Sequence, residues 1–171
     1  MSNINEHPSI VVINGSSRKN GDTAKVLEHL NDYLSFQNIF LGDYNIQYFD
    51  YVFNNQDDDF NQLLENYVLN ADCIILASPV YWYSVSAQLK TFMDRLSDLL
   101  IIRKDDGRKL RGKSMLSISV NQENTINECF YKPLELSAEY LGIQYLGHCH
   151  IGISQDKLLN QAQLEEISTL F

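Results

Sequence analysis

The chain has few of the residues that define disulfide-rich, metal-binding or membrane-spanning proteins. It holds three cysteines in 171 residues, at positions 73, 129 and 149. An odd number of widely spaced thiols argues against a disulfide framework, a zinc site and an iron–sulfur cluster. No run approaches the roughly 20 apolar residues of a membrane span, and the amino-terminal residues lack the apolar core of a signal peptide. We therefore expect a cytoplasmic chain without membrane contact, whose cysteines are small core residues.

Basic residues are also scarce. Lysine and arginine number 13 against 22 aspartates and glutamates, which gives a net charge of -9. Such an acidic surface disfavours nucleic-acid binding, although backbone amides can still bind a phosphate locally. Much of the basic charge gathers within residues 103–113. Charge runs of this kind are usually solvated, so we interpret this segment as a solvated loop.

What the sequence does contain is a regular alternation of apolar runs and helical patterns. The length and the hydrophobic content of 44% suit a single domain over residues 1–171. Strands are predicted at 10–13, 46–49, 73–77, 115–120 and 145–151, and helices at 26–34, 60–68, 89–100, 131–141 and 164–170. The alternation predicts a three-layer α/β sandwich with a five-stranded parallel sheet of order 2-1-3-4-5.

In such a fold the ligand lies beyond the carboxyl ends of the strands, where the strand order reverses. The loop at residues 15–23, after the first strand, offers glycines, hydroxyl groups and Arg18 before a helix begins. That is the chemistry of an anion site, although neither the P-loop nor the G-x-G-x-x-G pattern is present. A polar loop that merely caps its helix is the alternative. Asp22 would repel a phosphate, so we expect it to point outward or to cap the helix.

The second loop at this point follows the third strand and carries three consecutive aromatic residues. Tyr81, Trp82 and Tyr83 follow Pro79, and Trp82 is the only tryptophan in the chain. Three neighbouring rings cannot all pack into one core, so at least one should face outward and border the ligand crevice. Loop packing or a subunit contact is the alternative. The next helix is expected to be capped by Ser84 or Ser86.

Together the two loops resemble the NADPH-dependent FMN reductase family of flavodoxin-like proteins. The resemblance rests on residues 15–24 and 78–90 and continues to Phe92, Asp94 and Arg95. It implies FMN as the cofactor, NADPH or NADH as the electron donor and a homodimer, with a tetramer left open. Apolar residues near 96–102 could form the dimer contact.

The resemblance also implies roles for individual residues. The FMN phosphate would be held by Ser16, Ser17, Arg18, Asn20, Thr23 and Ala24. The isoalloxazine ring would lie along Pro79, Val80, Tyr81, Trp82, Tyr83 and Ser84. A third family loop is usually glycine-rich; here it reads 121–124, begins with Asn121 and has no glycine, which leaves the far edge of the ring open to question.

We expect a two-electron ping-pong reaction that reduces a quinone, azo compound, nitro compound or free flavin, a small acceptor in each case. Because FMN carries the redox chemistry, no catalytic side chain is assigned. The basic segment at 103–113 could meet the phosphate of the nicotinamide nucleotide. His148 and His150 on the fifth strand are expected to have a core or sheet-surface role. Two other functions remain open on the same fold: a flavodoxin-type electron carrier, and a binding or regulatory protein.

Overall fold

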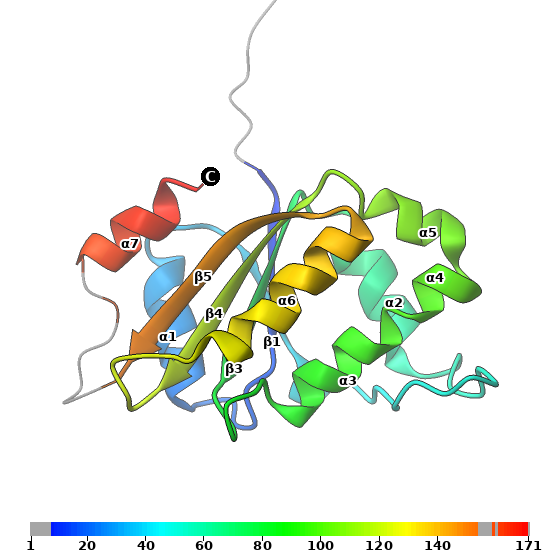
Figure 1. The fold of residues 1–171 in the computed structure, drawn as a ribbon, viewed down its shortest axis with the longest axis horizontal. Helices are drawn as coiled ribbons and strands as arrows, with labels where there is room; N and C mark the ends of the chain where they lie inside the picture. The colour runs from blue at the N-terminus through cyan, green and yellow to red at the C-terminus, as the bar shows by residue number, and fades with distance from the viewer. Residues whose placement is uncertain (1–7, 154–158, 160, 171) are drawn as a thin grey trace, which may run out of the picture.

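The architecture is a five-stranded parallel sheet of order β2-β1-β3-β4-β5 between two layers of helices (Figure 1). The computed structural model describes residues 8–153, 159 and 161–170. The strands are β1 Ile10–Asn14, β2 Gln37–Phe40, β3 Cys73–Pro79, β4 Ser114–Asn121 and β5 Gln144–Gly152. This sheet confirms the predicted α/β fold and its strand order.

The two faces of the sheet bury separate apolar clusters. Helices α1 (Asp22–Asn31) and α7 (Gln161–Ser168) cover one face (Figure 1), where Val12, Leu27 and Ile75 meet. Helices α2 (Asp59–Leu63), α3 (Ala87–Arg95) and α6 (Glu128–Leu141) cover the other. Strands β1 and β3 are apolar along nearly their whole length because they are buried from both sides.

The predicted helix over 89–100 is in fact broken. Helix α3 ends at Arg95, and α4 (Asp98–Ile101) and α5 (Lys104–Lys109) follow as separate short helices. Near the break, Leu96 and Ser97 donate their amides three residues back, to Met93 and Asp94, instead of four. Such tightened turns are typical of helix ends. Elsewhere α2 continues as a π-helical turn over Leu64–Val68, and Gly142 ends α6 in the left-handed conformation at φ 73°.

The prediction of the second strand at 46–49 is wrong. Strand β2 lies earlier, at the edge of the sheet, where Ile39 is the one buried residue of the strand and pairs with Ile13. Residues 46–49 form no strand, and carboxylates bind backbone amides in this segment and directly before it. The Asp58 carboxylate accepts the Gln47 amide at 2.8 Å, and the Asp59 carboxylate accepts the Asn45 amide at 2.6 Å.

Arg95 fixes this irregular segment to the helices. Its side chain is 1% exposed and forms ion pairs with Asp58 at 2.5 Å and Asp98 at 3.0 Å. The same guanidinium donates to the carbonyls of Gln47 and Asn55 at 3.2 and 3.1 Å. A buried cation is thus matched by two buried carboxylates and two carbonyls, as burial of charge requires.

Two further expectations are corrected by the fold. The basic segment is solvated but is not a loop: it contains α5, whose residues are not buried, and Arg103 is bound by Asp106 and Glu65, both at 2.6 Å. Cys129 is exposed rather than part of the core, whereas Cys73 is buried. Among the described residues, no helix combines the length and apolar character that crossing a membrane requires.

Candidate functional site

The candidate site lies where β1, β3 and β4 end, at the point where the strand order reverses. The loops after β1 and β3 approach each other closely there, and the Gly15 amide donates to the Ala77 carbonyl at 2.8 Å. A Cβ atom on residue 15 would lie 2.7 Å from the Leu89 Cβ and 2.8 Å from the Ser86 Oγ. Only glycine allows this approach, so Gly15 sets the spacing of the two loops.

The backbone of the first loop is arranged around Ser16. Its amide donates to the Asn14 Oδ1 at 3.0 Å, and its hydroxyl donates to the Arg18 carbonyl at 2.9 Å. The amides of Ser17, Lys19 and Asn20 form no hydrogen bond with any described residue. Backbone amides without a protein partner ahead of a helix are suited to binding an anion.

Some side chains of this loop and of the helix start after it have a hydrogen-bond or ion-pair partner among the described residues, and others have none. Thr23 is 2% exposed, yet its hydroxyl makes no hydrogen bond within the described part of the chain, and the Arg18 guanidinium there is equally unpaired. Lys19, in contrast, is held by Asp43 at 2.7 Å. Asp22 lies 3.7 Å from Lys25 and does not cap α1, because Gly21 occupies the capping position. The free donors are therefore neutral or cationic.

The second loop forms a tight two-residue turn with an aromatic tip. Tyr81 and Ser84 exchange backbone hydrogen bonds of 2.9 and 3.0 Å. Trp82 and Tyr83 between them have φ values of 50° and 63°. Positive φ at both central residues defines a type I′ turn, which normally contains Asn and Gly. Trp82 is 94% exposed, so this turn presents a ring to the solvent at the site.

The base of this loop is rigid. The Ser86 amide donates to the Ser78 Oγ at 2.9 Å, and the Ser86 hydroxyl accepts the Leu89 amide at 3.2 Å. Ser86, not Ser84, is thus the cap of α3. Pro79 and Val80 are half-buried, and the Val80 amide donates to the Val120 carbonyl of β4 at 3.1 Å.

The third loop, at residues 121–124, is bound to β5. The Asn121 side chain accepts the Glu123 amide at 2.8 Å, and the Asn121 carbonyl accepts the Ile153 amide at 2.7 Å. His150 Nε2 lies 2.9 Å from the Glu123 carbonyl oxygen. A Cβ on residue 152 would clash with that same oxygen, so the glycine that permits a close approach lies on β5 rather than in the loop.

The structure brings the predicted residues to one edge of the sheet, on three loops and on the ends of the strands and helix that flank them. Ser16 and Thr23 are buried, Ala24, Pro79, Val80 and Asn121 are half-buried, and Ser17, Arg18, Asn20, Tyr81, Trp82, Tyr83 and Ser84 are exposed. Sequence reasoning missed Asn14 and Ser78, which orient the first two loops. The available signal was a polar residue at the end of each buried strand.

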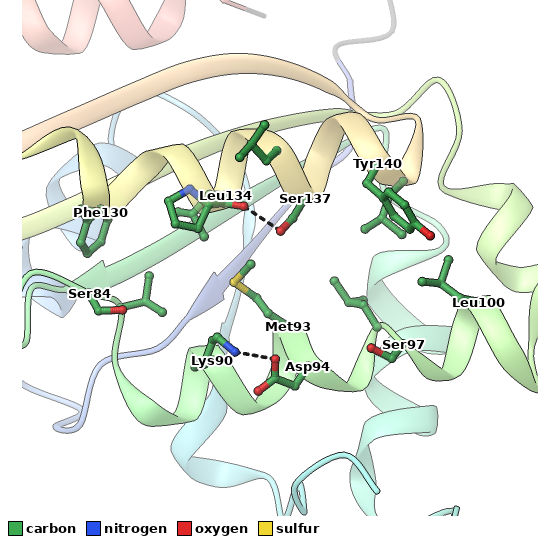
Figure 2. Close-up of a pocket in the computed structure, with 15 residues that line it drawn as sticks. Ser84, Lys90, Met93, Asp94, Ser97, Leu100, Phe130, Leu134, Ser137 and Tyr140 are labelled. Carbon is green, nitrogen blue, oxygen red and sulfur yellow. Dashed lines mark hydrogen bonds and ion pairs between the residues drawn. The ribbon is translucent and has the colours of Figure 1, made fainter. Parts of the chain in front are cut away.

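A groove of about 510 Å³ begins beside the aromatic turn and runs between α3 and α6 (Figure 2). Its walls are mainly apolar and include Met93, Leu100, Leu134 and Tyr140. Ser84 lies at the end of the groove nearest the site (Figure 2). The groove therefore connects the second loop to an apolar face of the molecule.

Known proteins are similar to this chain in sequence and in fold. The family model for NADPH-dependent FMN reductase matches residues 8–156. The chain is 33% identical over 97 residues to Bacillus subtilis YwqN, named as an NAD(P)H-dependent FMN-containing oxidoreductase, and the alignment covers 53% of each chain. The match thus spans about half the length of this curated relative.

Solved structures agree over nearly the whole chain. The Trp repressor binding protein of Bacillus subtilis superposes with a TM-score of 0.69 at 23% identity, covering 95% of this chain and 96% of the other. An NADPH-quinone reductase of P. pentosaceus gives a TM-score of 0.64 at 19% identity, with 95% of both chains covered. At this identity the structures support the fold, and the family follows from the match over residues 8–156. The chain belongs to the NADPH-dependent FMN reductase family.

Proposed function

We propose that the protein is an FMN-dependent oxidoreductase that passes two electrons from NAD(P)H to a small acceptor. Family membership supports FMN as the cofactor and NAD(P)H as the donor. When bound, FMN supplies the redox chemistry, and the protein supplies binding and orientation. A quinone, an azo compound, a nitro compound or a free flavin is the class of acceptor, and donor and acceptor would use the same crevice in turn.

One observation carries this proposal: free donors and an exposed aromatic turn lie on adjacent loops. The amides of Ser17, Lys19 and Asn20, which bind no described residue, are suited to a phosphate. The exposed ring of Trp82 on the next loop is suited to a planar heterocycle. The donor set therefore fits a molecule with a phosphate at one end and a flat ring at the other.

The residues of the chain then have distinct roles. Arg18 and Thr23 would hold the phosphate together with the free amides. The residues from Pro79 to Ser84 would lie along the ring, and Asn121 would border its far edge. No side chain is assigned to proton transfer, because hydride transfer does not need one.

The experiment is a titration of the purified protein with FMN, followed by NADPH oxidation assays. We expect tight FMN binding and rapid NADPH consumption once a quinone is added. A protein that refuses FMN would favour a binding or regulatory protein and refute the proposal. Stable accumulation of one-electron-reduced flavin, with slow NADPH oxidation, would favour a flavodoxin-type carrier.

We further propose a homodimer that forms through the groove between α3 and α6. Leu100, Ile101 and Ile102 are each more than 40% exposed beside it, and Tyr140 is 78% exposed. Apolar surface of this kind is typical of protein interfaces. Because Ser84 lines the same groove, a second copy would contact the loop proposed to bind the ring. Sedimentation equilibrium of wild type and Leu100→Glu would test the interface, and a wild-type monomer would refute it.

A further inference from the structure

A chain of hydrogen bonds runs along β4 and β5 and ends at the third loop. At its far end the Tyr145 hydroxyl lies 2.5 Å from the Ser117 Oγ, which is 2.7 Å from His148 Nδ1. Ser117 is fully buried, and the His148 ring stacks on Tyr131 of α6 with ring centres 4.9 Å apart. The stacked ring has little freedom to turn away from the chain.

The second half of the chain passes through Ser119. The Ser119 Oγ lies 2.9 Å from His148 Nε2 and 2.7 Å from His150 Nδ1. The remaining nitrogen of His150 is 2.9 Å from the Glu123 carbonyl oxygen. Both ring nitrogens of both histidines are therefore engaged.

A β-bulge makes the chain possible. Met115 pairs with Tyr145, but Leu116 pairs with Gly147, so Leu146 is an extra residue on β5. Gly147 accommodates the bulge at φ 133°. Without the extra residue, Tyr145 and His148 would point to opposite faces of the sheet, because side chains alternate along a strand.

The Glu123 carbonyl at the end of the chain of hydrogen bonds determines which group donates in each bond. The Glu123 carbonyl can only accept, so His150 Nε2 must carry a hydrogen. In a neutral ring His150 Nδ1 then accepts, and the Ser119 hydroxyl must donate to it. Ser119 in turn accepts from His148 Nε2–H.

The remaining bond directions, as far as the Tyr145 hydroxyl, follow from the same hydrogen on His148. With its hydrogen on Nε2, His148 accepts at Nδ1 from the Ser117 hydroxyl, and Ser117 accepts from the Tyr145 hydroxyl. Burial lowers the pKa of His148 to about 4, so its ring is neutral as this pattern requires. One arrangement of hydrogens thus satisfies every bond in the chain.

We propose that His150 is a positioning residue for the third loop, and that Ser119 and His148 act through it by holding it in the Nε2–H tautomer. The donated hydrogen fixes the Glu123 carbonyl and with it residues 121–124. The effect of this loop on flavin binding rests on the proposed function. The histidine tautomers and the hydrogen bond from His150 to the Glu123 carbonyl are independent of it. The loop has no glycine; the Asn121 side chain, which accepts the Glu123 amide, shapes it from within, and the His150 hydrogen bond anchors it to β5 from outside.

Nitrogen-15 NMR tests the tautomers directly in the wild-type protein. Long-range proton–nitrogen spectra at mildly alkaline pH should show both His148 and His150 with their hydrogen on Nε2. A hydrogen on Nδ1 of either ring would overturn the proposal. This measurement needs neither a variant nor a cofactor.

Variants then test the coupling to the loop. Ser119→Ala should give His150 a mixture of tautomers, shift the amide signals of residues 121–124 and weaken FMN binding about fivefold, the effect of one ordinary hydrogen bond. The matched control is Ser114→Ala at the start of the same strand, which should change none of these. Ser119→Thr keeps the hydroxyl and should restore the tautomer.

The outcomes separate this inference from the proposed function. If wild type fails to bind FMN, the proposed function fails, and the tautomers and loop shifts still decide the inference. If Ser119→Ala changes the His150 tautomer but leaves the loop signals and FMN affinity unchanged, the positioning role is refuted.

Discussion

The hydroxyl of Tyr81 donates to the Oγ of Ser17 at 3.1 Å and so joins the two loops at the point where the strand order reverses. These residues are 64 positions apart in the sequence. The bond ties the aromatic turn to the loop that carries the unpartnered amides. It gives the two halves of the candidate site a direct connection.

Removing this connection should weaken FMN binding more than folding. Tyr81→Phe and Ser17→Ala should each reduce FMN affinity about threefold to fivefold, because the loops lose one exposed hydrogen bond that holds them in place. The double variant should bind FMN no more weakly than either single variant, as a double-mutant cycle measured by fluorescence titration would show. Fully additive losses would mean that the two hydroxyls act separately.

Arg18 should matter for the phosphate and not for the ring. Arg18→Ala should weaken FMN binding about tenfold to a hundredfold, because a charge-assisted hydrogen bond is lost. Riboflavin, which lacks the phosphate, should bind wild type and variant alike. Lys19→Ala is the matched control, since Lys19 already pairs with Asp43, and it should have little effect. Equal losses for FMN and riboflavin would contradict the assignment.

The aromatic turn should lower the stability of the fold and strengthen FMN binding. Replacing Trp82 and Tyr83 by Asn and Gly should raise the free energy of unfolding by about 1–2 kcal/mol, because those residues favour positive φ. The same change should weaken FMN binding about threefold to tenfold through the loss of ring contact. Chemical denaturation and FMN titration measure the two effects. Unchanged FMN affinity would remove Trp82 and Tyr83 from the site.

The tryptophan also provides a signal. Trp82 is the only tryptophan in the chain, so its fluorescence reports on this turn alone. Titration of the wild-type protein with FMN should quench that emission in parallel with binding measured by flavin absorbance. Binding without quenching would place the flavin away from the turn.

Arg95 should be needed for folding. Arg95→Met should lower the free energy of unfolding by about 3–5 kcal/mol, because Asp58 and Asp98 would be left as buried, unpaired carboxylates. Lys90→Met removes an exposed pair with Asp94 and should change stability by less than about 1 kcal/mol. Thermal and urea denaturation of both variants would compare them. Similar small losses would show that the Arg95 network adds little.

Acid should destabilise the protein through His148. Its pKa falls from 6.5 to about 4 on folding because burial disfavours the charged ring. Between these values the unfolded chain binds more protons, so stability is complete above the unfolded pKa and is lost as pH falls towards 4. The partly solvated ring should account for about 2 kcal/mol of that loss. Urea denaturation at several pH values in this range gives the free energy of unfolding as a function of pH. His148→Gln should make that dependence flatter, and His29→Gln should leave it unchanged.

The sequence was sufficient for the central strands because β1 and β3 are buried and apolar, β4 is buried with alternating apolar residues, and polar loops bound all three. It failed for the second strand because β2 is an edge strand with a single buried residue, Ile39, while 46–49 has a stronger apolar pattern. That segment is held instead by Asp58, Asp59 and Arg95, which come from distant positions. Such long-range side-chain contacts leave no periodic signal.

The candidate site was predicted only in part, because the sequence shows residue types and loop positions but not the detailed backbone conformation. Residue types and loop position were enough to bring Ser16, Thr23 and Trp82 to one edge of the sheet. The turn type at Trp82 and Tyr83 was not predictable, because neither residue favours positive φ. The hydrogen-bond chain through His148 depends on a bulge at Gly147, and one inserted residue is invisible in an alternating pattern.

The buried guanidinium of Arg95 has a consequence for how the surface can change. It donates hydrogen bonds to the carbonyls of Gln47 and Asn55. The stretch between these two residues is therefore a loop whose two ends are held together. Tyr48, Tyr51 and Val52 within it are 70%, 84% and 72% exposed, and none of them belongs to the apolar core. We therefore expect residues added or exchanged there to leave the sheet undisturbed, which makes this stretch suited to grafting a new segment onto the protein.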